Sequence, residues 1–135
     1  MAEYNCIRNQ TDADYFIEQA NGLHDGYITS LQFINDGIET KNGYTSYDYS
    51  KRKLVMQILV TSQIGSPTVE MVFENIIEWQ VCFGTSDIFG CLFGFDGNVI
   101  TMTDGPSLER EILYQNTFIQ ATQVSWRILD KSNGS

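Results

Sequence analysis

The sequence predicts a mostly β domain of the α+β class, with a largely antiparallel sheet of six to seven strands that is curved or folded into a sandwich. Two observations indicate this fold. Apolar residues alternate with a period of two over much of the chain, as they do in strands. Only one stretch, near the N-terminus, carries a strong helical stripe, and we expect that helix to pack on one face of the sheet. The length of 135 residues indicates that residues 1–135 form a single domain.

The predicted helix spans Thr11–Gly22. Thr11 can cap its first turn, where Asp12 and Asp14 favour the positive end of the helix dipole. Asn21 and the glycine after it provide a left-handed stop. The apolar residues that form its single stripe are Ala13, Phe16, Ile17 and Ala20. One stripe means one buried face.

Two strands, Leu54–Val60 and Val69–Glu74, form the predicted centre of the sheet. The first is apolar on both faces, as in a central strand, whereas the second alternates apolar residues with Glu70 and Glu74. The loop between them, Gln63–Pro67, is short enough only for antiparallel strands.

The carboxylates Glu70, Glu74 and Glu78 are four residues apart, so this region also allows a helix. Like charges at that spacing repel each other on a helix, and the β-branched and aromatic content favours a strand. We expect the strand to continue to Val81 after a bulge or bend at Asn75–Ile76.

Local patterns predict the remaining elements. The strand Tyr27–Ile34 has a slip in register near Thr29–Ser30, which indicates a bulge. Its predicted inward-facing side chains are Ile28, Leu31 and Phe33. Asp96-Gly97 is a hairpin turn signal. The other predicted elements are turns at Asn35–Gly37 and Gly84–Asp87, strands Ile88–Phe95, Asn98–Met102 and Thr117–Leu129, and a helix Leu108–Tyr114 capped by Ser107.

The stretch Glu39–Lys53 has a different composition. From Thr40 onward it lacks aliphatic residues but contains three tyrosines and half of the chain's Lys and Arg side chains. We expect a long loop or a ragged edge strand. Tyrosines supply large contact areas at low entropic cost and are typical of protein-binding loops, although they could instead pack on the sheet edge. The predicted partner-binding residues are Tyr44, Tyr47, Asp48 and Tyr49.

The chain is acidic, with a net charge of −9. No Lys or Arg occurs between Leu54 and Glu109, where there are seven carboxylates. Such a surface repels nucleic-acid phosphates and anionic membranes, so we expect neither as a partner. It would attract a basic protein partner, although a high net charge also serves solubility alone.

The cysteines Cys6, Cys82 and Cys91 cannot all pair within the chain, and their spacing matches no zinc site. Cys82 and Cys91 could bridge a hairpin or remain buried thiols. The N-terminus lacks the basic and apolar regions of a signal peptide, and no apolar run is long enough to span a bilayer. We therefore expect a cytoplasmic protein without a metal or cofactor.

His24 is the only histidine, so any histidine-based catalysis must use it. His24 and Asp25 form a candidate polar site, but neighbouring strand residues point to opposite faces unless a turn intervenes. The alternative is that Asp25-Gly26 is a turn and His24 binds a nearby backbone group. Because no triad or phosphate-binding spacing is present, no catalytic residue is assigned.

The pattern His-Asp-Gly-x-Ile-x-x-Leu-x-Phe at 24–33, followed by Val-Glu-Met-Val-Phe-Glu-Asn-Ile at 69–76, resembles small bacterial families of mostly unknown function. In these families a His-Asp start leads into a β-meander, and some members are immunity proteins of polymorphic toxin systems. The resemblance implies a cytosolic β-rich domain that binds a protein and has no cofactor. It implies no catalytic residue.

These observations favour a non-enzymatic protein-interaction domain, of the immunity type if the resemblance holds, that binds a basic partner. The alternative is a small-ligand-binding domain, or a hydrolase that uses His24 in a pocket under Gly90 and Gly94. Homodimerisation through an exposed strand edge is a third hypothesis.

Overall fold

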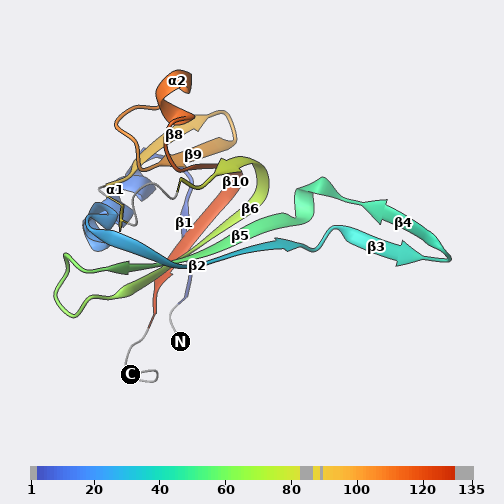
Figure 1. Cartoon of the computed structure of the whole chain (residues 1–135), viewed down its shortest axis with the longest axis horizontal. Helices are drawn as coiled ribbons and strands as arrows, with labels where there is room; N and C mark the ends of the chain where they lie inside the picture. Colours follow the sequence, from blue (N-terminus) through green and yellow to red (C-terminus); the bar gives the residue numbers. More distant parts are fainter. Residues whose placement is uncertain (1–2, 83–86, 89, 130–135) are drawn as a thin grey trace.

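The computed structural model describes residues 3–82, 87–88 and 90–129, apart from the side chains of residues 49, 87 and 88. One antiparallel sheet dominates it, in the order β7-β2-β5-β6-β10-β9-β8, with β1 beside β10 (Figure 1). The sheet does not close into a barrel. Helix α1 packs on one face of it, as predicted. The elements are β1 (Asn5–Ile7), α1 (Gln10–Gln19), β2 (Gly26–Asn35), β3 (Ile38–Lys41), β4 (Tyr44–Tyr47), β5 (Arg52–Val60), β6 (Thr68–Gln80), β7 (Asp87–Ile88), β8 (Leu92–Asp96), β9 (Val99–Thr103), α2 (Arg110–Leu113) and β10 (Phe118–Ile128), with single 3-10 turns at Asn21–Leu23 and Tyr49–Lys51.

The central hairpin is confirmed. Strands β5 and β6 pair with Leu54 opposite Phe73 and Met56 opposite Met71, and all four side chains are fully buried. The helical alternative for β6 is wrong, since the strand continues to Gln80. A bulge is present next to the predicted position: Asn75 has φ 52°, and Ile77 is the extra residue between Ile76, which pairs with Ala121, and Glu78, which pairs with Gln120.

Helix α1 begins one residue earlier than predicted, and its N-cap lies two residues earlier. Asn9, rather than Thr11, is the N-cap, because its side-chain oxygen accepts a hydrogen bond from the backbone N–H of Asp12 at 2.9 Å. The left-handed stop is confirmed by φ values of 51° at Asn21 and 62° at Gly22. Phe16 is fully buried, so the face of α1 that packs on the sheet is the predicted one.

The bulge in β2 lies where the sequence predicts it, between Ile28 and Ser30. Ile28 and Leu31 pack against the core, but Phe33 is 46% exposed, so its predicted burial is wrong. Phe33 lies near the C-terminal end of β2. This end of the strand is the one farther from α1, and the helix does not cover the sheet there (Figure 1). Its ring stacks on Trp79 instead, with 6.2 Å between the ring centroids.

The second hairpin turns at Gly97, which has φ 61°, and joins β8 to β9 as predicted. The predicted strand Ile88–Phe95 is confirmed only from Leu92, where β8 begins. Its start is wrong, because Asp87–Ile88 is a separate strand that pairs with the start of β2 at the opposite sheet edge. The predicted turn at Gly84–Asp87 falls outside the described residues, apart from the strand residue Asp87. Leu108 fills the space beside Gly94, where an added Cβ would lie 2.8 Å from its Cδ1 atom.

The C-terminal half of the chain otherwise follows the prediction. Helix α2 is shorter than expected, and its N-cap is Glu109 rather than the predicted Ser107. The Ser107 hydroxyl instead accepts a hydrogen bond from the backbone N–H of Glu109 at 3.1 Å. In β10, Val124 and Trp126 are buried in the core as predicted. Among the described residues, no helix is both long enough and apolar enough to span a membrane.

Candidate functional site

Strands β3 and β4 form a two-stranded sheet of their own that projects from the body, and we call residues 38–47 the arm (Figure 1). The prediction of a loop or ragged edge strand is therefore wrong. The signal that was missed is Asn42-Gly43. Both residues have positive φ, 55° and 81°, as a type I′ hairpin turn requires, and Asn-Gly is the preferred pair for that turn.

The arm presents large side chains to solvent on both faces. Opposite residues of an antiparallel pair share a face. Ile38 therefore lies beside Tyr47 on one face, and Tyr44 lies beside Lys41 on the other. All eight strand residues are exposed, Tyr44 to 80%, Tyr47 to 60% and Ile38 to 51%. The structure thus places two of the predicted binding tyrosines on one element but on opposite faces.

The base of the arm is held by backbone contacts. The Asp48 N–H donates to the Gly37 carbonyl at 2.8 Å, so the chain enters and leaves the arm at one point. The Asp48 carboxylate accepts from the Ser50 hydroxyl at 2.6 Å and from the Ser50 N–H at 3.1 Å, which holds its pKa below the usual value. Asp48 thus caps a turn at the base. The side chain of Tyr49 lies outside the described part of the chain.

Gly37 is essential to this base, because a Cβ atom there would lie 2.0 Å from the Asp48 carbonyl oxygen. We expect Gly37→Ala to displace the arm and to lower the free energy of unfolding by about 1–3 kcal/mol. Backbone NMR shifts of the arm and urea denaturation would measure both effects. Gly90→Ala is the matched control, since a Cβ there meets nothing within 4 Å. Unchanged arm shifts in the Gly37 variant would contradict the expectation.

The candidate polar pair, His24 and Asp25, lies at an exposed corner. A turn is present at His24–Asp25, where Asp25 has φ 55°, and it brings His24 Nε2 within 3.7 Å of Asp25 Oδ2. Binding of the His24 ring to a backbone group stays a prediction. Both backbones are tied to the β5–β6 loop: the His24 carbonyl accepts from Ser62 Oγ at 2.5 Å, and the Asp25 carbonyl from Thr61 Oγ1 at 2.8 Å. A catalytic or binding role for the pair stays a prediction.

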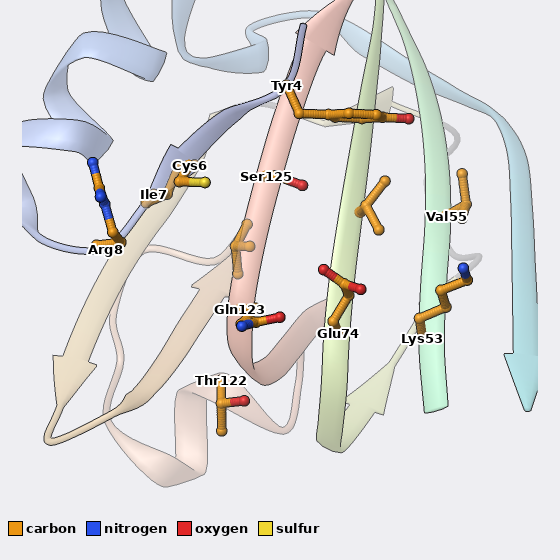
Figure 2. Close-up of a pocket in the computed structure, with 12 residues that line it drawn as sticks. Tyr4, Cys6, Ile7, Arg8, Lys53, Val55, Glu74, Thr122, Gln123 and Ser125 are labelled. Atoms are coloured by element: carbon orange, nitrogen blue, oxygen red, sulfur yellow. The ribbon is translucent and has the colours of Figure 1, made fainter. Parts of the chain in front are cut away.

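A hollow of about 560 Å³, which no local sequence pattern predicts, lies on the sheet face opposite α1. Figure 2 shows Tyr4 across one end, with Val55 and Lys53 on one side and Ser125 on the other. Its volume suits a small ligand, but neither His24 nor Asp25 lines it. The lining residues come from four distant segments, so only the outward positions of the alternating strands could have indicated them.

Beside this hollow, a polar row crosses three strands. Gln57, Glu70 and Arg127 are register partners on β5, β6 and β10. Glu70 accepts from Arg127 Nε at 3.0 Å, from Gln57 Nε2 at 3.1 Å and from the Tyr4 hydroxyl. The Arg127 guanidinium also lies 4.5 Å from the centroid of the Tyr4 ring. The row therefore fastens the N-terminal segment to the sheet.

The pKa of Glu70 reflects two opposing effects. Burial raises it, but the hydrogen bonds from Tyr4 and Gln57, together with the charge of Arg127, outweigh burial and leave it below its usual value. Glu70 therefore stays ionised at neutral pH. This row has a structural explanation and needs no catalytic one.

The described cysteines are free thiols, so the Cys82–Cys91 bridge is not formed. Burial raises the pKa of Cys91 to about 12, which keeps that thiol protonated and unreactive at neutral pH. Among the described residues, no group of three or more His, Cys, Asp or Glu side chains is placed to hold a metal ion.

Comparison of the chain with protein-family models, with curated proteins and with solved structures finds no significant match. The resemblance of 24–33 and 69–76 to bacterial immunity families therefore stays a prediction.

Proposed function

We propose that this protein is a non-enzymatic protein-interaction domain that contacts its partner through the β3–β4 arm. The observation that supports this most is the exposure of all eight arm strand residues, including Tyr44, Tyr47 and Ile38. A two-stranded hairpin on its own is at best marginally stable in water. A partner that buries the arm would therefore stabilise it, and tyrosines are among the residues that contribute most to protein interfaces.

The partner that fits the chain best is a basic protein. The net charge of −9 would steer a basic surface toward the body of the protein. Between Leu54 and Glu109 no Lys or Arg side chain opposes this attraction. Neutralising a basic toxin, as an immunity protein does, is the finer form of this proposal. It rests on the acidity and on the sequence resemblance.

The direct test removes the arm. Gly37 and Asp48 already lie 2.8 Å apart, from carbonyl oxygen to backbone nitrogen, so two glycines can replace residues 38–47 without straining the body. Affinity capture from extracts of the source cell would compare the full chain, the arm-deleted chain and a Tyr44→Ser/Tyr47→Ser variant. We expect both variants to lose a specific partner that the full chain retains.

Tyr15→Ser is the matched control, because Tyr15 is half exposed on α1, away from the arm. This variant should keep the partner. Capture should also weaken steeply with added salt if the partner is basic. An arm-deleted chain that is folded by circular dichroism and still captures the same partner would refute the proposal. Salt-insensitive capture would refute only the basic partner.

A further inference from the structure

Strand β2 lies at an edge of the main sheet over most of its length. One side pairs with β5 from Gly26 to Asn35. On the other side, among the described residues, only β7 pairs with it, and only at Gly26 and Tyr27. The backbone groups on the outer side of Leu31–Asn35 therefore face no described strand. An open row of backbone donors and acceptors is a template for another strand.

This edge also lacks the usual protection. Natural edge strands carry charged residues or proline, which prevent pairing with other chains. The ten residues of β2 contain neither, although the chain has 25 charged side chains. The nearest charged residues along the chain are Asp25 and Asp36, one on each side of the strand. The one bulge lies between Ile28 and Ser30, so the stretch Leu31–Asn35 is regular.

We propose that β2 pairs antiparallel with the β2 strand of a second copy of this chain. Two copies with a net charge of −9 repel each other, and an uncharged strand is where they can approach with the least like-charge contact. Two-fold symmetry makes the pairing self-complementary, since each copy presents the same donors and acceptors to the other. Phe33, 46% exposed beside this edge, would gain cover.

The paired strands run in opposite directions, and each arm follows the C-terminal end of its own β2. The two arms therefore project from opposite ends of the joined sheet. This inference does not rest on the proposed partner binding, because dimerisation leaves both arms exposed.

The molecular mass of the protein in solution tests whether the chain forms this dimer. Sedimentation equilibrium from micromolar to millimolar concentration should show a species of twice 15.3 kDa for the native chain. Gln32 is exposed in the middle of the edge, so Gln32→Lys places like charges close together across the two-fold axis. We expect it to weaken dimerisation about tenfold. Gln123→Lys is the matched control, because Gln123 is also exposed on the sheet face opposite α1 but lies on β10.

A charge-swap experiment tests the geometry. Gln32→Glu alone should also weaken dimerisation, whereas a mixture of the Lys and Glu variants should recover it as a heterodimer. Circular dichroism would establish that every variant is folded. A native chain that stays at 15.3 kDa would overturn the proposal and leave the edge for a strand of another protein. A dimer that Gln32→Lys and Gln123→Lys affect equally would also overturn it, because its interface would lie elsewhere.

Discussion

We expect Phe16→Ala to lower the free energy of unfolding by about 3–5 kcal/mol, the largest effect of any single change considered. Phe16 is fully buried where α1 meets the sheet. Its ring meets Phe93 edge-on at 5.7 Å and Trp126 at 5.1 Å between centroids, which joins the helix to both β8 and β10. Truncation leaves a cavity between layers and removes two aromatic contacts.

Domains of this size are stable by about 5–15 kcal/mol, so the Phe16 variant would lose a large share of its stability. Thermal denaturation should show a midpoint lower by about 10–20 °C. Glu18→Ala, on the exposed side of the same helix, is the control and should change the stability by about 0.5 kcal/mol at most. Equal effects of the two substitutions would mean that α1 is not docked through Phe16.

Replacing Glu70 by Gln should lower the free energy of unfolding by about 2–4 kcal/mol at pH 7. The Glu70 side chain is nearly buried, and its loss of charge leaves Arg127 without its carboxylate partner, while the Tyr4 hydroxyl and Gln57 lose a charged acceptor. Urea denaturation would measure the loss. Glu74→Gln, on the same strand but exposed, should change the stability by about 0.5 kcal/mol at most.

The effect of Glu70 should depend on pH with a definite sign. Its pKa is lower in the folded chain than in the unfolded chain, so folding releases protons in that range. The stabilisation is complete above the unfolded pKa of about 4.5 and is lost as the pH falls through the folded pKa. The difference in free energy of unfolding between the native chain and the Glu70→Gln variant should therefore become smaller below about pH 5. A difference that stays constant down to pH 3 would contradict the charge-based explanation.

Alternation of apolar residues was enough to predict the core of this fold. It located β5, β6 and β10 and their buried faces, because each strand has one side that must leave water. It failed where tertiary context decides burial: Phe33 fits the inward pattern but lies beyond the helix. It also joined Ile88 to β8, because local pattern cannot show that two neighbouring segments pair with opposite edges of a sheet.

The site was only partly predictable. Composition alone indicated Tyr44 and Tyr47 as candidate binding residues, and their exposure is consistent with that prediction. The residues that shape the arm are Asn42 and Gly43, whose preference for a hairpin turn is a local sequence signal. The role of Asp48 in capping the turn at Ser50 was not predicted, and its contact with a partner stays a prediction. The hollow near Tyr4 and the row at Glu70 depend on register between distant strands, which no local pattern specifies.

The backbone hydrogen bond between Gly37 and Asp48, which closes the base of the arm, makes the arm a modular insertion. Residues can be added or removed in cross-strand pairs beyond that point, because each pair lengthens or shortens the ladder while the ends stay in place. The reach and the sequence of the arm can therefore diverge between related proteins while the sheet beneath remains constant. The same property makes this hairpin a natural position for grafting a foreign recognition peptide.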